Sequence, residues 1–125
     1  MISLPVDPRD RAERLARVRR YLAALGLANF RAIVFGSVGR GDFTADSDTD
    51  LLIVSDELPA ELRARLDLLF SAREIAPEVE PIGWREEDWR RREREGDPFV
   101  AVLKREGVEV AGREDPDKIE PHPGR

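Results

Sequence analysis

Apolar residues recur every three or four positions between about residues 8 and 25, and Gly26 ends this pattern. The spacing predicts an amphipathic helix with one buried side, with Asp7 as its N-cap. The apolar members of the pattern are Leu15, Val18, Leu22 and Leu25. The other sides carry six arginines, which we interpret as a solvated surface or, alternatively, as a docking face for an acidic partner: Arg9, Arg11, Arg14, Arg17, Arg19 and Arg20.

Four short segments have the composition of β-strands. Residues 31–35 are apolar on both faces, which predicts a strand in the middle of its sheet. Residues 48–55 are also apolar on both faces beyond two aspartates, and residues 78–84 form a third predicted strand. Pro81 has no N–H to donate, so this third strand is predicted either at a sheet edge or paired over only part of its length. Residues 108–110 are predicted as a last short strand.

A helix is predicted in each of the two connections between the first three strands. The short one covers residues 38–43, with Ser37 as its N-cap. The longer one begins at Leu58-Pro59, and Pro77 breaks the chain after it. Its helically spaced apolar residues predict a buried stripe of Leu62, Leu66 and Leu69, with Phe70 beside it.

Two more helices are predicted after the third strand. Residues 85–95 are highly charged, and Trp89 is their main apolar residue. The second helix begins at Pro98 with Asp97 as its N-cap, and Gly107 ends it. Its predicted buried residues are Phe99, Val102 and Leu103.

This order of elements predicts one α/β (α+β) domain over residues 1–112, built from a small mixed β-sheet with flanking helices. The full length of 125 residues fits a single compact domain. From residue 113 onward the sequence is rich in charge and proline and has almost no apolar residue. Residues 113–125 are therefore predicted to be a disordered tail.

The composition excludes several classes of site. The chain has no cysteine and a single histidine, His122, which excludes thiolate zinc sites and argues against a histidine-based triad. The net charge of -5 does not favour nucleic acid as a direct partner. No apolar stretch is long enough to span a membrane, and the first residues lack a signal-peptide pattern, so a cytoplasmic protein is expected.

The candidate chemistry lies in the turn between the first two strands, from Gly36 to Asp50. Its glycine-rich start offers backbone N–H groups that suit phosphate. Asp48 and Asp50 project from one face of the second strand, where two carboxylates repel each other unless a cation lies between them. We therefore expect a divalent cation, bound by these carboxylate oxygens, at this place. The turn therefore predicts phosphoryl or nucleotidyl transfer.

A third carboxylate can come from the third strand. Glu80 is the preferred candidate, and Glu78 is the alternative because it lies on the same face by parity. Together with Asp48 and Asp50, such a residue would hold two magnesium ions, which activate the attacking oxygen and stabilise the leaving one. Glu80 could also serve as the base. The other interpretation of Glu80 is an exposed edge-strand charge.

Two other phosphate-binding motifs do not fit this turn. The P-loop requires G-x-x-x-x-G-K-[ST], and the turn contains no lysine. The dinucleotide fingerprint requires G-x-G-x-x-G and a single acid about 20 residues later. Here the order is G-x-x-G-x-G, and the acids follow Gly36 by 12 and 14 residues.

This turn resembles the G-S-x10-D-x-D signature of nucleotidyltransferases in the DNA polymerase beta-like superfamily. Its Gly36-Ser37 is followed by ten further residues and then by Asp48-x-Asp50. The S-D-x-D-L-L-I-V form of residues 47–54 and the small size are most similar to the minimal nucleotidyltransferases. The resemblance covers most of the predicted domain. It implies a polymerase beta palm-like fold, a small mixed sheet with helices packed against it.

The resemblance also implies a role for each residue of the motif. Gly36 and Ser37 would hold the terminal phosphates of the nucleotide, and ATP is the expected substrate. The two aspartates would bind Mg²⁺, and Glu80 would complete the acidic triad. Arg40 lies inside the loop, where it either contacts phosphate or is a solvated surface residue.

Partners are implied by the same resemblance. Minimal nucleotidyltransferases often form a two-protein module with a helical HEPN-domain ribonuclease, which they neutralise by contact or by adenylylating a tyrosine. We expect the acceptor site of this chain to be completed by such a protein or by a homodimer. The expected activity is transfer of AMP to a hydroxyl of a partner protein. The alternatives are a non-catalytic antitoxin and a dimeric enzyme acting on a small molecule such as an aminoglycoside.

Overall fold

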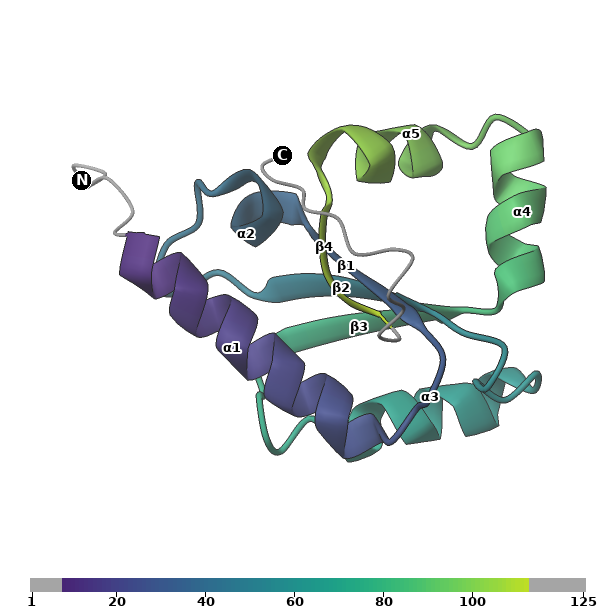
Figure 1. The fold of residues 1–125 in the computed structure, drawn as a ribbon, viewed down its shortest axis with the longest axis horizontal. Coiled ribbons are helices and arrows are strands. Elements are labelled where there is room, and N and C mark those ends of the chain that lie inside the picture. Colours follow the sequence, from purple (N-terminus) through teal and green to yellow (C-terminus); the bar gives the residue numbers. More distant parts are fainter. Residues whose placement is uncertain (1–7, 113–125) are drawn as a thin grey trace.

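The computed structural model describes residues 8–112, so the predicted tail and the predicted N-cap Asp7 lie outside the described residues. Within that range the chain forms five helices and four strands (Figure 1). The helices are α1 (Pro8–Leu25), α2 (Gly36–Arg40), α3 (Leu62–Ser71), α4 (Glu86–Arg94) and α5 (Pro98–Glu106). The strands are β1 (Arg31–Phe35), β2 (Thr49–Val54), β3 (Val79–Trp84) and β4 (Val108–Gly112). None of these helices is both long and apolar enough to cross a membrane.

The four strands form one mixed sheet in the order β3-β2-β1-β4. β1 is antiparallel to both β2 and β4, whereas β3 is parallel to β2, as its long connection through α3 requires. The predicted fold class and the central position of β1 are therefore confirmed. β3 is an outer strand, which also confirms the edge position inferred from Pro81.

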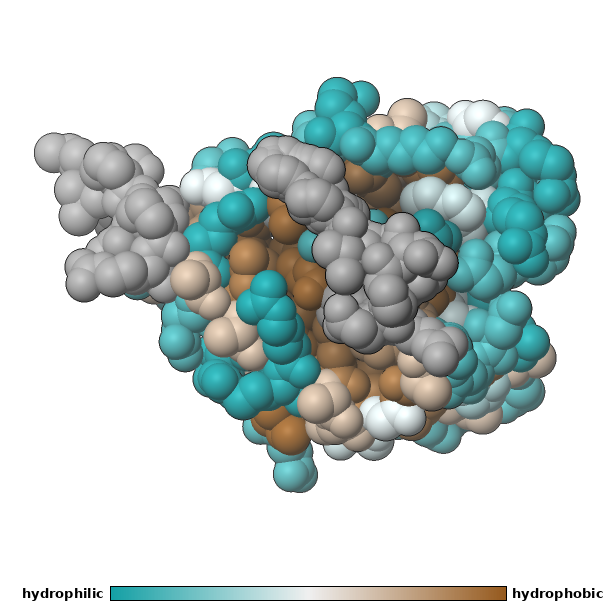
Figure 2. Space-filling model, in the orientation of Figure 1, coloured by the Kyte–Doolittle hydropathy of each residue, from teal (hydrophilic) through white to brown (hydrophobic). Residues whose placement is uncertain are grey.

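Side chains alternate between the two faces of the sheet, and each face has its own core. α1 and α3 pack on one face, and α4 and α5 supply the core residues of the other (Figure 1). Apolar residues gather in the middle of the molecule, whereas α1 and α4 carry hydrophilic residues on their outer sides (Figure 2). The second core contains both tryptophans and consists of Ile33, Leu52, Val54, Trp84, Trp89, Val100 and Leu103.

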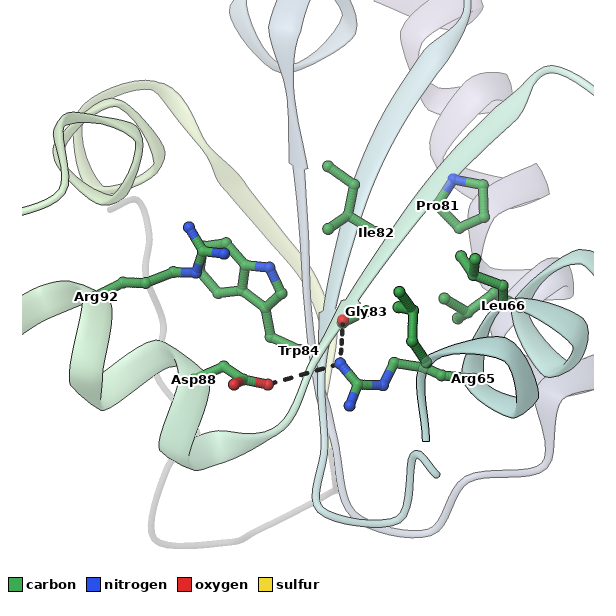
Figure 3. A pocket seen from close by; sticks show the side chains of 10 residues that line it. Arg65, Leu66, Pro81, Ile82, Gly83, Trp84, Asp88 and Arg92 are labelled. Carbon is green, nitrogen blue, oxygen red and sulfur yellow. Dashed lines mark hydrogen bonds and ion pairs between the residues drawn. The ribbon is translucent and has the colours of Figure 1, made fainter. Parts of the chain in front are cut away.

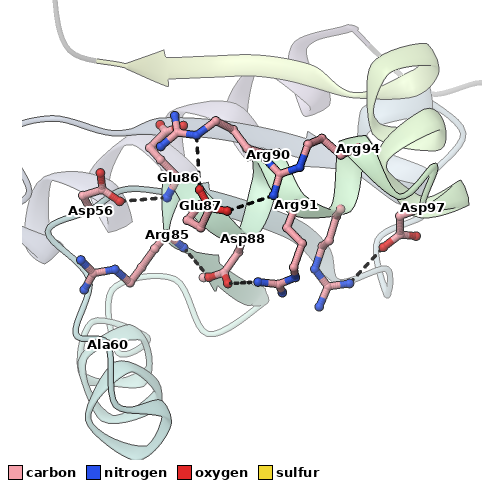
Figure 4. Close-up of polar contacts among 12 residues, drawn as sticks. Asp56, Ala60, Arg85, Glu86, Glu87, Asp88, Arg90, Arg91, Arg94 and Asp97 are labelled. Atoms are coloured by element: carbon pink, nitrogen blue, oxygen red, sulfur yellow. Dashed lines mark hydrogen bonds and ion pairs between the residues drawn. The ribbon is translucent and has the colours of Figure 1, made fainter.

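Polar contacts hold α4 in place in addition to Trp89 (Figure 4). The Asp88 side chain accepts a hydrogen bond from the backbone N–H of Arg85 at 2.9 Å, and Asp56 accepts one from the N–H of Glu86 at 2.9 Å. These bonds satisfy N–H groups that the first turn of a helix leaves without partners. α4 is thereby anchored beside the end of β3.

The predicted helix starts are correct for α5 and wrong for α2. Asp97 caps α5 as predicted, because its side chain accepts a hydrogen bond from the N–H of Phe99 at 2.9 Å. α2 begins at Gly36, two residues before the predicted start, and Phe35 occupies its N-cap position without a side-chain hydrogen bond. Ser37 therefore lies within the first turn of α2 and does not cap it.

The predicted buried stripe of α3 is also wrong. The helix begins at Leu62 with Glu61 as its N-cap, and of the predicted stripe only Leu69 is buried. Leu62 is 64% exposed, Leu66 39% and Phe70 43%. Periodicity identifies which residues share a side of a helix, but it does not say which side faces the sheet. Here the sheet contacts the neighbouring side, on which Leu69 lies.

Candidate active site

Gly36 and Asp50 lie in direct contact at the start of the candidate site. The antiparallel register of β1 and β2 sets Phe35 opposite Asp50, which brings the turn after β1 against the first residues of β2. Gly36 has a φ of +70°, and a Cβ at this position would overlap Oδ2 of Asp50. Glycine suits both this left-handed backbone and the close approach of the carboxylate. The sheet thus joins the two halves of the motif.

The surroundings of Asp50 destabilise its negative charge. Asp50 lies in β2 and is half-buried, whereas Asp48 is exposed and lies one residue before β2 begins, so the predicted start of this strand is wrong. Burial raises the pKa of Asp50, the charges of Asp48 and Glu80 raise it further, and the charge of Arg40 lowers it. Asp48 and Glu80 each lie close enough to Asp50 to disfavour its charge. A bound cation would relieve that repulsion.

The structure distinguishes the two candidates for the third carboxylate. The parallel register sets Glu80 beside Asp50, with both side chains on the same face of the sheet. Glu78 lies before β3 begins, so strand parity does not apply to it. Its carboxylate accepts two hydrogen bonds from Arg17 of α1, at 2.7 and 3.0 Å, which lower the pKa of Glu78. Glu80 is therefore the candidate that faces Asp50.

The chemistry of these donors suits a divalent cation, because carboxylate oxygens are its preferred ligands. Among residues 8–112, however, no three acidic or histidine side chains come together closely enough to enclose a metal ion. Glu80 lies instead 3.4 Å from the guanidinium of Arg73. Both side chains are substantially exposed, so this ion pair is weak. Glu80 would have to turn from Arg73 to join the aspartates at a metal ion.

Arg14 of α1 organises the loop that carries Asp48, a role that the sequence analysis did not predict. Its guanidinium donates a hydrogen bond to Oγ1 of the buried Thr49 at 2.8 Å. It also donates to the carbonyl oxygens of Thr44 and Ala45, at 3.2 and 3.3 Å. Because Thr49 lies between the two aspartates in sequence, Arg14 holds the start of β2 from the opposite face.

Arg11 and Arg17 of α1 hold the neighbouring elements in the same way. Arg11 donates to the carbonyl oxygens of Val38 and Gly39 at the end of α2, at 3.1 and 2.8 Å. Arg17 holds Glu78 at the start of β3. The predicted solvated surface is therefore wrong for these residues, although Arg19 and Arg20 are exposed as predicted. One feature of the sequence could have indicated this shared role. Arg11, Arg14 and Arg17 are spaced three residues apart, which places them on one side of the helix.

Ser37 directly follows Gly36, and the charge of Arg40 acts on Asp50, but contact of either residue with phosphate remains a prediction. Ser37 is half-buried in the first turn of α2. Arg40 is exposed and forms ion pairs with Asp42 at 3.2 Å and Glu106 at 3.5 Å, and its pKa is raised chiefly by Asp42. A phosphate would have to compete with these two carboxylates for Arg40.

Comparison with known proteins assigns this arrangement to a class. The sequence model of the nucleotidyltransferase domain family matches residues 15–109 of this chain, and the chain therefore belongs to the nucleotidyltransferase domain family. A solved structure of a Sulfolobus solfataricus protein assigned as a nucleotidyltransferase is similar, with a TM-score of 0.61, 20% sequence identity and coverage of 84% of this chain and 86% of that chain. At this identity the likeness shows the fold alone. No curated protein sequence matches this chain at a significant level.

These findings confirm the resemblance to nucleotidyltransferases of the polymerase beta-like superfamily. The match contains the Gly-Ser turn, both aspartates and Glu80, so the whole candidate site lies within the family's domain. Membership of the minimal subfamily remains a prediction.

Proposed function

We propose that this protein transfers AMP from ATP to a hydroxyl group on a partner protein. The contact between Gly36 and Asp50 is the observation that carries the proposal. It brings a glycine-serine turn and a pair of aspartates to one place in a nucleotidyltransferase domain. The acceptor class follows from the resemblance to minimal nucleotidyltransferases, whose partners include HEPN-type helical proteins.

In the proposed reaction, the acceptor hydroxyl oxygen attacks the α-phosphorus of ATP. A bond forms between these atoms, the bond from the α-phosphorus to the bridging oxygen of the β-phosphate breaks, and pyrophosphate leaves. Glu80 takes the hydroxyl proton as the base. Gly36 and Ser37 orient the terminal phosphates, so that the α-phosphorus lies in line with the attacking oxygen.

The residues that would hold Mg²⁺ are Asp48, Asp50 and Glu80. When bound there, Mg²⁺ supplies neutralisation of the phosphate charge and activation of the acceptor oxygen. The raised pKa of Asp50 supports this assignment, because a carboxylate that is costly to ionise gains most from a cation beside it.

A second candidate function is neutralisation of a partner by contact, without catalysis. The separation of Glu80 from the aspartates favours it, because Glu80 pairs with Arg73 and the described residues contain no closely gathered metal-ligand group. Under this alternative the carboxylates would be unused remnants of an active site.

Label transfer tests both functions. Purified protein, Mg²⁺ and ATP labelled at the α-phosphate are added to lysate of the source organism, in parallel with Asp48→Asn and with ATP labelled at the γ-phosphate. A macromolecular band that requires wild-type protein and the α-label supports nucleotidyl transfer. Label from the γ-phosphate would indicate a kinase instead. No label in any reaction, with a partner still retained by the Asp48→Asn variant, would support the contact function.

A further inference from the structure

Two arginines lie against the outer edge of β3, and each of them pairs with one carboxylate. Arg65 of α3 donates a hydrogen bond to the carbonyl oxygen of Gly83 at 3.2 Å and forms an ion pair with Asp88 at 3.6 Å (Figure 3). The side chains of this ion pair are 13% and 25% exposed. Arg73, which follows α3, forms the corresponding ion pair with Glu80 near the other end of the strand.

The carboxylates of these two ion pairs differ in their other partners. Asp88 also accepts a hydrogen bond from the backbone N–H of Arg85, so a movement of its side chain would leave this N–H at the start of α4 without a partner. The Glu80 carboxylate has one hydrogen-bond or ion-pair partner within residues 8–112, Arg73 at 3.4 Å, and its side chain is 47% exposed. Glu80 can therefore leave its arginine at little cost, whereas Asp88 cannot.

The guanidinium of Arg73 is fixed by contacts that do not involve Glu80. Its Nε donates a hydrogen bond to the carbonyl oxygen of Val79 at 2.9 Å, and a terminal nitrogen donates one to that of Pro77 at 2.6 Å. The guanidinium also lies 5.3 Å from the centre of the Phe70 ring, within the range of a cation–π contact. Because these contacts are independent of Glu80, Arg73 remains a fixed positive charge when the carboxylate moves.

Asp50 offers Glu80 a second position, on the face of the sheet. The parallel register pairs these two residues, and neighbouring strands lie about 4.8 Å apart. The charge of Glu80 contributes to the raised pKa of Asp50, so the two carboxylates are within electrostatic reach of each other. A divalent cation between them would replace this repulsion with attraction. Glu80 therefore has two alternative partners, Arg73 and a cation at Asp50.

We propose that Arg73 is a positioning residue, which holds Glu80 away from Asp50 until a divalent cation binds. This inference rests on the proposed function, because it takes Asp50 and Glu80 as ligands of that cation. The ion pair lowers the affinity of the site for the cation, since Glu80 must leave Arg73 before it can bind. In the metal-free protein, the same ion pair draws the charge of Glu80 away from Asp50 and limits their repulsion.

Binding of Mn²⁺, without nucleotide or acceptor, tests this role. Mn²⁺ takes the same oxygen ligands as Mg²⁺, and it broadens the NMR signals of nearby amides, so titration of the Asp50 and Glu80 signals gives the place of binding and the dissociation constant. We expect Arg73→Gln to lower this dissociation constant roughly three- to fivefold, as loss of an exposed competing ion pair predicts. Arg63→Gln, which removes an exposed ion pair with Asp67 from α3, is the control and should bind like the wild type. An unchanged or higher dissociation constant in Arg73→Gln would overturn the proposal.

Two further variants separate the ion pair from the other contacts of Arg73. Arg73→Lys keeps a positive charge beside Glu80, so its dissociation constant should stay closer to the wild type than that of Arg73→Gln. Equal gains in affinity in these two variants would assign the effect to the lost carbonyl contacts and overturn the proposal. In the Glu80→Gln background, Arg73→Gln should bring no further gain, because the carboxylate for which the arginine competes is absent. A full gain in that background would contradict the proposal as well.

Asp50→Asn distinguishes a failure of this inference from a failure of the proposed function. We expect this variant to lose Mn²⁺ binding at the site. If the wild type binds Mn²⁺ through Asp50 and Arg73→Gln binds it no more tightly, the role of Arg73 is wrong and the proposed function stands. If Mn²⁺ leaves the Asp50 and Glu80 signals of the wild type unchanged, the proposed metal site and the role of Arg73 are both wrong.

Discussion

Two glutamates at the start of β3, only two residues apart, show how differently this protein treats negative charge. Glu78 accepts hydrogen bonds from Arg17, which lower the pKa of its carboxyl group. The ionised form of Glu78 therefore stabilises the fold. Two residues later, Glu80 lies beside Asp50, whose pKa is raised chiefly by burial and further by the charges of Asp48 and Glu80. On the side of the sheet covered by α1, arginines pair with the charge of Glu78 and donate hydrogen bonds to the carbonyl oxygens of the loops. On the other side of the sheet, the ionised form of Asp50 lowers stability, as is common for carboxylates in functional sites.

The largest expected effect is on catalysis, from Asp50→Asn. We expect nucleotidyl transfer to fall by roughly 10³-fold or more, because a metal-binding charge is lost. Stability should change in the opposite direction. The raised folded-state pKa of Asp50 makes its ionisation destabilising, so the asparagine variant should melt at a higher temperature at pH 7.

Thermal melts at several pH values check this prediction. The penalty at Asp50 is absent below the ordinary aspartate pKa and develops as pH rises through the raised folded-state value. The stabilisation by Asp50→Asn should therefore disappear in acid. A lower melting temperature at pH 7 would show that the charge is already compensated in the folded protein.

The next largest effect is expected for Gly36→Ala, which tests the contact that joins the motif. We expect a loss of about 1–3 kcal/mol in unfolding free energy and a strong loss of transfer, because the methyl group displaces Asp50. Gly26→Ala is the matched control. Gly26 has a similar φ of +74° with nothing within 4 Å of an added Cβ, so it carries the backbone strain alone. Equal losses in the two variants, measured by urea denaturation, would mean that the Asp50 contact contributes nothing.

A smaller effect on stability separates the two glutamates directly. Glu78→Gln should lower the unfolding free energy by about 1 kcal/mol at pH 7, because its partly exposed ion pair with Arg17 is lost. The lowered pKa means that this contribution exists above the ordinary glutamate pKa and is lost as pH falls through the folded-state value, so the cost of the variant should vanish in acid. Glu80→Gln should be neutral or slightly stabilising. If Glu80→Gln is the more costly variant, the two assignments are reversed.

Arg14→Met, which removes the side-chain hydrogen bonds to the loop before β2, should lower stability less than Glu78→Gln does. Its hydrogen bonds are partly exposed, so we expect a loss below about 1 kcal/mol. Transfer should fall about tenfold because Asp48 is less well positioned. Arg19→Met, at an exposed site on the same helix, is the control and should leave both quantities unchanged. The two variants are compared by kcat at saturating ATP and by thermal melts.

Much of the fold follows from local patterns along the chain. The apolar segments at 31–35, 48–55 and 78–84 became β1, β2 and β3, and Pro81 identified the outer strand. Asp97 is an effective N-cap because it acts within its own turn. Such features depend on neighbours a few residues away, and the sequence displays those neighbours.

The errors concern contacts between distant segments. The sequence identified the apolar residues of α3, but their exposure depends on which side of the helix faces the sheet. The arginines of α1 were predicted to be solvated because their partners are distant in the sequence. Thr49 lies 35 residues from Arg14, and Glu78 lies 61 residues from Arg17. A long side chain finds its acceptor only after the sheet has brought that acceptor into reach.

For the candidate site, the sequence alone determined the family motif and the aspartate pair, because G-S-x10-D-x-D is a local pattern. It left Glu78 and Glu80 as alternatives, because alternation along a strand gives both the same parity. Only the tertiary structure shows which of the two faces Asp50. β3 begins at Val79, which leaves Glu78 in the preceding turn for Arg17, and the parallel register places Glu80 beside Asp50. Register and strand start result from packing of the whole sheet, and no single segment encodes them.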